Sequence, residues 1–164
     1  DDQLDDVDIQ NRGELSDFRG GINTAAIAEN ISHAILEKTT GSIDKNSTVF
    51  MVIPASTRAR HTRRYKGFCE MVSRKLGISN GYGGIGILYD REGYRNTPEA
   101  SRIENLSFDN SYFANKAVVL FDDIITTGAS FRQISRKLIS LGAKKVTGVM
   151  LGETVAWDDK VRKS

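Results

Sequence analysis

The fold of this chain is decided by the stretch Val118-Val119-Leu120-Phe121-Asp122-Asp123-Ile124-Ile125-Thr126-Thr127-Gly128-Ala129-Ser130. The apolar residues up to Phe121 have the length and composition of a buried strand, and two adjacent carboxylates follow them directly. In parallel α/β sheets, ligands bind outside the carboxyl ends of the strands. Asp122 and Asp123 are therefore predicted to lie at the ligand-binding edge of such a sheet.

The residues after the two acids predict an anion-binding turn. Gly128 permits a close backbone approach, and the unpaired amides and dipole of a first helical turn favour an anion. A phosphate-binding turn so close to paired acids suits a ligand with vicinal hydroxyls beside a phosphate, such as ribose 5-phosphate. The hydroxyl-rich turn that opens the helix consists of Thr126, Thr127, Gly128, Ala129 and Ser130.

Other interpretations of these motifs fail on the sequence itself. A strand that ends in Asp is also typical of a Walker B element, but the chain contains no G-x-x-x-x-G-K-[ST]. Haloacid-dehalogenase-type phosphatases have acids two positions apart, whereas these are adjacent. Gly81 to Gly86 reads G-x-G-x-x-G, but it follows a helix and leads into a strand, which is the wrong order for a dinucleotide site and indicates a turn.

Outward from this stretch, strand patterns and helix patterns alternate. Unbroken apolar strands of this kind are typical of parallel sheets. We therefore expect an α/β fold with a mainly parallel, twisted sheet flanked by helices. Residues 90–115 read as an irregular excursion with one short helix capped by Thr97 and started by Pro98. Strands are predicted at about 48–53, 85–89, 117–121 and 146–151, and helices at about 24–39, 65–76 and 129–141.

Composition sets limits on the class of protein. Of the 164 residues, 27% are charged and 39% hydrophobic, which is typical of a globular protein, and no apolar run is long enough to span a membrane. A single cysteine, Cys69, and two histidines provide neither a disulfide nor a Cys/His metal site, so we expect a reducing, cytoplasmic location. We expect Cys69 to serve packing, and we assign His61 no role as a general base.

Charge divides the chain into parts. Residues 1–19 carry a net charge of −5, and because the whole chain is +2, the remainder is +7. We expect an acidic N-terminal arm at 1–21, one domain at 22–151 and a polar C-terminal segment at 152–164. Trp157, in that segment, suits packing on a sheet edge or stacking on a base. The chain begins with Asp rather than Met, so we expect it to be part of a longer protein.

A basic segment follows the first predicted strand. It runs from Pro54 to Lys66 and carries five formal positive charges. Guanidinium groups at a strand end can bind phosphate oxygens in bidentate fashion. Arg and Lys interleaved with Tyr65 also suit contact with a nucleic-acid backbone, and a solvated basic loop is the third interpretation.

The stretch from Val118 to Ser130 resembles the phosphoribosyl pyrophosphate (PRPP) binding signature of type I phosphoribosyltransferases. Two further segments resemble the ComF-like competence branch of that superfamily: Arg63-Arg64-Tyr65-Lys66-Gly67-Phe68, and Arg102 with Asn105-Leu106 and Phe108. The chain departs from that branch at Cys69-Glu70, where Asn-Gln is typical, and it has no N-terminal cysteine zinc finger.

The resemblance implies a role for each part of the site. Asp122 and Asp123 would anchor the ribose and act in catalysis, and Thr126 to Ser130 would hold the 5′-phosphate. Arg91 and Arg95 lie where the superfamily has a mobile catalytic loop that closes over PRPP. Mg²⁺ would be held mainly by PRPP and water rather than by the protein. The leaving pyrophosphate would bind to Ala55, Ser56, Thr57 and Arg58, with Arg58 neutralising charge.

Two functions are therefore carried forward. The first is a Mg²⁺-dependent phosphoribosyltransferase that transfers ribose 5-phosphate to or from an acceptor of the nitrogenous-base class, with pyrophosphate as co-product. The second is a non-catalytic module of the same fold that senses PRPP or a nucleotide, or binds nucleic acid through the basic segment Arg58 to Lys66. The sequence specifies neither the acceptor base nor the oligomeric state, and predicts no membrane partner.

Overall fold

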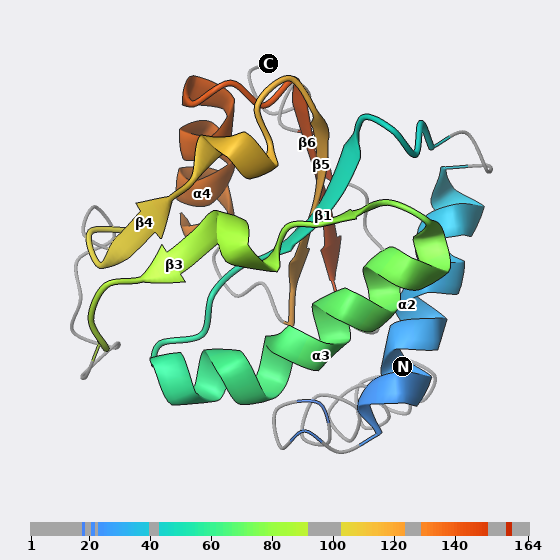
Figure 1. Cartoon of the computed structure of the whole chain (residues 1–164), viewed down its shortest axis with the longest axis horizontal. Helices are drawn as coiled ribbons and strands as arrows, with labels where there is room; N and C mark the ends of the chain where they lie inside the picture. Colours follow the sequence, from blue (N-terminus) through green and yellow to red (C-terminus); the bar gives the residue numbers. More distant parts are fainter. Residues whose placement is uncertain are drawn as a thin grey trace, which may run out of the picture.

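The computed structural model of the chain describes residues 18, 21, 23–39, 43–91, 103–123, 129–150 and 157–158. The main sheet has the strand order β2-β1-β5-β6-β7, in which the first four strands are parallel and β7 pairs antiparallel with β6. The expected α/β class with a mainly parallel sheet flanked by helices is confirmed (Figure 1). The strands are β1 (Thr48–Val52), β2 (Ser79–Asn80), β5 (Ala117–Asp122), β6 (Lys145–Met150) and β7 (Trp157–Asp158).

Helices cover both faces of this sheet. Helices α2 (Thr24–Lys38) and α3 (Arg58–Leu76) pack side by side on one face, and α4 (Ala129–Ser140) packs on the other (Figure 1). Alternate residues of β1 and β5 point to opposite faces, as the strand period requires. Phe50 and Phe121 pack with α2 and α3, whereas Met51 and Leu120 pack with α4. The central strands are therefore buried on both sides.

Helix α3 begins earlier than the sequence analysis predicted. It starts at Arg58 rather than near Tyr65, so most of the basic segment is helical and not a loop. Thr57 caps the helix, because its hydroxyl accepts a hydrogen bond from the Arg60 backbone N–H at 3.2 Å. No Gly or Pro interrupts residues 58–66, and long charged side chains are good helix formers, so the cap sets the start.

The strand predicted at 85–89 is also corrected. Residues Ile85–Ile87 form β3, which pairs antiparallel with β4 (Leu106–Phe108) in a separate two-stranded sheet, and the edge of the main sheet is the short β2 instead. Part of the predicted irregular excursion is therefore ordered as β4 and a 3-10 turn at Asn110–Tyr112. The helix predicted at Thr97 and Pro98 lies outside the described residues.

The glycine-rich stretch is the turn that was expected, and it is closely packed. A 3-10 turn at Tyr82–Gly84 leads directly into β3. A Cβ on Gly81 would lie 2.5 Å from Met51 Cγ and 2.8 Å from the Phe50 carbonyl oxygen. Gly81 therefore allows the turn to lie directly against β1. This packing accounts for the glycine without a cofactor-binding role.

Residues near both ends of the chain take part in the fold. Phe18, within the segment predicted to be an acidic arm, is fully buried in the cluster that includes Tyr65, Phe68 and Phe121. At the other end, the backbone of Trp157 pairs with Gly148 of β6, which places Trp157 and Asp158 at the edge of the sheet. Within the described part of the chain, no helix is both long and apolar enough to cross a membrane.

Candidate functional site

The carboxyl ends of β1 and β5 bring two predicted parts of the site to one edge of the sheet. Val52 and Phe121 are partners in the parallel register, and the Ile53 N–H donates to the Phe121 carbonyl at 2.8 Å. Asp122 ends β5, and Asp123 follows it. The two acids therefore lie beside the segment that leaves β1, as expected from the meeting of parallel strand ends.

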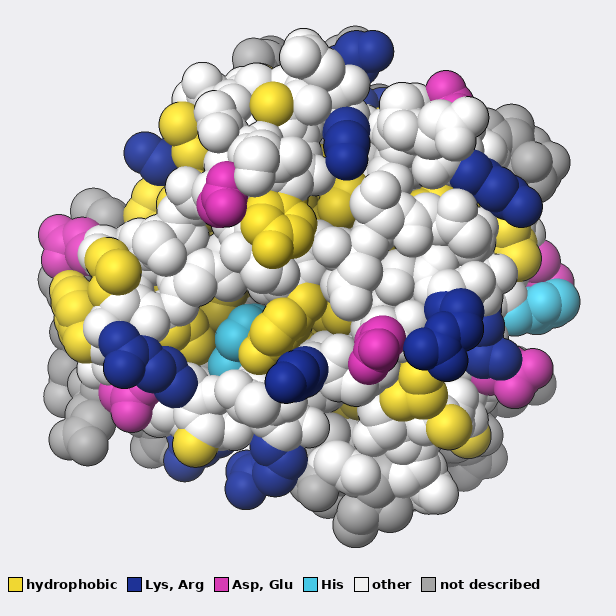
Figure 2. All heavy atoms as spheres, in the orientation of Figure 1, with side chains coloured by type: hydrophobic (Ala, Val, Ile, Leu, Met, Phe, Trp, Pro, Cys, Tyr) yellow, Lys and Arg dark blue, Asp and Glu magenta, His cyan; other side chains and the backbone are white. Residues whose placement is uncertain are grey.

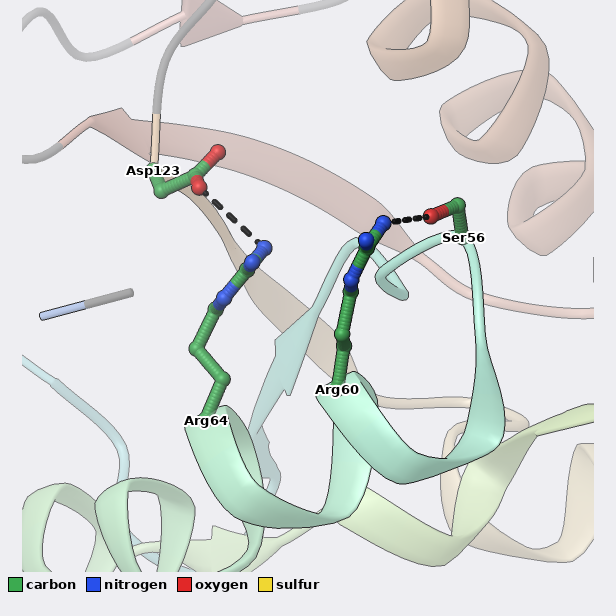
Figure 3. Close-up of polar contacts among 4 residues, drawn as sticks. All are labelled: Ser56, Arg60, Arg64 and Asp123. Carbon is green, nitrogen blue, oxygen red and sulfur yellow. Dashed lines mark hydrogen bonds and ion pairs between the residues drawn. The ribbon is translucent and has the colours of Figure 1, made fainter. Parts of the chain in front are cut away.

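The two adjacent acids have different surroundings. The Asp123 residue is only 7% exposed, and its Oδ2 lies 3.3 Å from Nη1 of Arg64 on α3 (Figure 3). The Arg64 side chain is itself 13% exposed, so this is a largely buried ion pair. Asp122 is half-buried. The two carboxylates, predicted to share one role, therefore differ: Asp123 forms an ion pair with Arg64, and Asp122 is the more accessible of the two.

Tyr65 is close enough to both acids to feel their charge. It is almost completely buried, and burial raises the pKa of its phenol well above the ordinary value. The negative charges of Asp123 and Asp122 raise that pKa further. Tyr65 therefore stays a neutral phenol and adds no negative charge to the site.

The predicted pyrophosphate segment is fastened to the end of β3. The Arg91 backbone N–H donates to the Ser56 carbonyl at 2.9 Å, and the Arg58 backbone N–H donates to Asp90 Oδ1 at 2.8 Å. The Arg58 guanidinium donates from Nε to the Ile87 carbonyl at 2.8 Å and from Nη2 to the carbonyl of the next residue. The backbone of Arg91 is thus brought to this segment.

Two arginines that the sequence analysis counted only as part of the basic segment face the site from α3. The Arg60 Nη1 donates to Ser56 Oγ at 3.2 Å, and Arg64 one turn later reaches Asp123 (Figure 3). Their spacing of four residues would have placed them on one face, had the helix been predicted to start at Arg58. The partnership of Arg64 with Asp123 spans 59 positions and has no local signal.

The predicted phosphate turn is only partly described. Helix α4 begins at Ala129, six positions after Asp123, with Ser130 in its first turn, and this start agrees with the helix predicted at about 129–141. Thr126, Thr127 and Gly128 lie outside the described residues, as does Arg95 of the predicted catalytic loop. Their roles in phosphate and PRPP binding stay predictions.

A pocket of about 280 Å³ lies on the other side of the α3 start. His61 is 6% exposed and stacks on Tyr82 with ring centroids 4.9 Å apart. Neither of its ring nitrogens has a hydrogen-bond partner among the described residues. Figure 2 shows one histidine side chain recessed among hydrophobic ones in this way. The pocket is lined by Arg58, His61, Thr62, Tyr82, Gly83, Ile85, Gly86 and Ile87.

Burial and charge keep His61 neutral. Burial, together with the nearby positive charge of Arg64, lowers its pKa to about 4. The thiol of Cys69 is also fully buried, which raises its pKa and makes it unreactive, so its predicted packing role is confirmed. The described residues contain no cluster of three or more His, Cys, Asp or Glu side chains able to hold a metal.

Comparisons with known proteins identify the fold. No family model matches the chain, and no curated protein matches it. A solved structure described as the allosteric regulatory enzyme of purine biosynthesis matches with a TM-score of 0.50 and 19% sequence identity. The match covers 77% of this chain but only 25% of that protein, so this chain corresponds to about a quarter of its length. At this identity the likeness shows a shared fold.

Proposed function

We propose that this chain belongs to the type I phosphoribosyltransferase superfamily and transfers ribose 5-phosphate between PRPP and a nitrogenous base. The observation that carries the proposal is the arrangement at one sheet edge. Asp122 ends β5, the segment after β1 lies beside it, and α4 begins shortly afterwards in the chain. A solved enzyme of purine biosynthesis with the same fold supports this assignment.

The proposed chemistry needs positioning and charge more than covalent catalysis. Displacement at the anomeric carbon creates oxocarbenium character on the sugar and negative charge on the departing pyrophosphate. Asp122 would accept hydrogen bonds from the ribose hydroxyls and offset the positive charge that develops on the ring. The amides at the start of α4 would hold the 5′-phosphate, and the arginines at the start of α3 would face the pyrophosphate.

The proposal includes Mg²⁺, and the residues present suit it. Mg²⁺ prefers oxygen ligands and keeps several waters, so phosphate and ribose oxygens of PRPP would supply most of its ligands. The half-buried Asp122 carboxylate is a suitable oxygen neighbour for the ion, and Asp123 is ion-paired with Arg64. When bound, the ion would neutralise part of the phosphate charge.

Calorimetric titration of PRPP with Mg²⁺ tests the proposal. Asp122→Asn keeps the size of the side chain and removes its charge, so we expect PRPP affinity to fall roughly tenfold or more. Glu70→Gln, on the exposed side of α3, is the matched control and should bind as wild type does. Absence of PRPP binding by the wild type, or equal affinity of Asp122→Asn, would falsify the assignment.

One observation favours a second candidate. Helix α3 exposes several basic side chains along its length, among them Arg63 and Lys66, which suits a nucleic-acid backbone. Release of pyrophosphate from PRPP in the presence of a panel of bases would support the enzyme. Salt-dependent RNA or DNA binding that weakens in Arg63→Gln with Lys66→Gln, without any turnover, would support the binding module.

A further inference from the structure

We infer that Arg60 and Arg64 of α3 form a paired guanidinium site for the pyrophosphate group, and that Arg58 holds the neighbouring backbone instead. The inference rests on the proposed function, because it names the side chains that would take the pyrophosphate of PRPP. It reassigns the charge-neutralising role that the resemblance gave to Arg58.

Arg58 is already committed to protein partners. Two nitrogens of its guanidinium donate to the carbonyls of Ile87 and Leu88, and its backbone N–H donates to Asp90. To reach a ligand with the same nitrogens, it would have to give up charge-assisted hydrogen bonds that fasten β3 to the start of α3. Its position therefore suits holding this segment in shape.

Arg60 and Arg64 project toward the sheet edge from successive turns of α3. Figure 3 shows both side chains on the same side of the helix, one directed at Ser56 and the other at Asp123. Ser56 belongs to the segment predicted to hold pyrophosphate, and Asp123 is one of the two acids predicted to anchor the ribose. The pair thus spans the interval between the two predicted halves of a PRPP site.

The charges at this place favour an anion. The pair carries two positive charges, while the ion pair with Asp123 compensates one of them. Arg64 Nε is buried and has no hydrogen-bond partner among the described residues. A guanidinium presents five N–H donors in a planar fork that matches phosphate oxygens. Asp123 fixes the largely buried Arg64 in place, so little side-chain entropy remains to be lost on binding.

Titration of inorganic pyrophosphate in Mg²⁺ buffer, followed by calorimetry, tests the pair. Arg60→Gln should weaken pyrophosphate binding roughly tenfold, since it removes a charge-assisted contact from an exposed side chain that the fold does not need. Arg74→Gln is the matched control: it removes the same charge from the same helix, but from its last turn, where the side chain is 74% exposed. Its effect should stay within roughly twofold, as for a screened surface charge.

Two further variants separate the roles of the arginines. Arg64→Lys keeps the charge but loses the fork, so we expect weaker pyrophosphate binding with an unfolding temperature close to that of the wild type. Arg58→Gln should lower the unfolding temperature more than Arg60→Gln while affecting pyrophosphate affinity less. Thermal unfolding of every variant identifies any loss of binding that is only loss of fold.

The outcomes distinguish this inference from the proposed function. Equal losses in Arg60→Gln and Arg74→Gln, a larger loss in Arg58→Gln, or no pyrophosphate binding by the wild type would overturn the arginine pair, while PRPP binding by the wild type would still stand. Pyrophosphate binding that depends on Arg60, in a protein that does not bind PRPP, would support the pair and overturn the proposed function.

Discussion

Adjacent residues of the same type can have different roles, and the two acids after β5 illustrate this at the scale of single residues. Asp122 is the last residue of β5, whereas Asp123 follows the strand and its carboxylate contacts Arg64 on α3. Asp123 meets Arg64 in a largely buried setting, where removal of one partner leaves an uncompensated charge. Asp122→Asn alone is therefore a cleaner test of ligand binding than a variant that also changes Asp123.

His61 should make the fold sensitive to mild acid. Its pKa in the folded chain is about 4, below the ordinary 6.5, because it is buried and close to Arg64. Between these two pH values His61 is protonated in the unfolded chain but not in the folded chain. The free energy of unfolding therefore falls as the pH drops from about 6.5 to about 4. Above about pH 6.5 the imidazole is neutral in both the folded and the unfolded chain, so His61 causes no loss of stability there. The loss from this one group is at most roughly 3 kcal/mol.

Urea unfolding at several pH values between 4 and 7 measures this effect. His61→Phe keeps an aromatic ring against Tyr82 and removes the titrating group, so its stability should vary less with pH than that of the wild type. The two proteins share the same carboxylates, so the pH dependence due to carboxylates cancels when one free energy of unfolding is subtracted from the other. Parallel curves for the two proteins across the window would show that His61 does not titrate in this way.

At the scale of elements, the start of α3 depends on one hydroxyl. Thr57 accepts the Arg60 backbone N–H and has the extended backbone of a helix cap. Thr57→Ala should lower the free energy of unfolding by about 1 kcal/mol, and Thr57→Ser should restore most of it. Chemical denaturation of the three proteins measures this. A Thr57→Ala protein as stable as the wild type would mean that neighbouring contacts alone set the helix start.

Elements with strong local patterns could be predicted, and those set by distant contacts could not. Strands β1, β5 and β6 and helices α2 and α4 lie within about two residues of their expected bounds, since each carries a long apolar run or a helical period. The start of α3 was missed because charge density was interpreted as a loop. The short β2 and β4 depend on the strands they pair with, which no local pattern encodes. The strand β3 lies within the one predicted at 85–89, but its pairing with β4 outside the main sheet had no local signal.

The same distinction applies to the candidate site. Asp122 and Asp123 could be placed at the ligand edge because they directly follow a recognisable strand, and the start of α4 followed from its helical period. Arg64 could not be paired with Asp123, because the packing of α3 on the sheet brings them together across 59 positions. The carbonyl partners of Arg58 likewise depend on the separate β3–β4 sheet.

At the scale of the whole molecule, one aromatic cluster joins distant parts of the chain behind the site. The Phe18 ring meets the rings of Tyr65, Phe68 and Phe121 at centroid separations of 5.6, 4.9 and 5.7 Å. Phe121 directly precedes Asp122, and Tyr65 directly follows Arg64. Phe18 therefore packs against the direct neighbours of Asp122 and Arg64 and helps to fix the position of both charged residues.

Phe18→Ala should consequently destabilise the whole domain. Deleting a fully buried aromatic ring removes its burial and leaves a cavity, at a cost of roughly 3–5 kcal/mol. Tyr89→Ala, which removes an aromatic side chain from a residue that is 54% exposed, should cost less than about 1 kcal/mol. Guanidinium unfolding followed by both tryptophan fluorescence and circular dichroism measures the two differences. If Phe18→Ala proves no more harmful than Tyr89→Ala, residue 18 does not belong to the folding unit, and the site must be held without it.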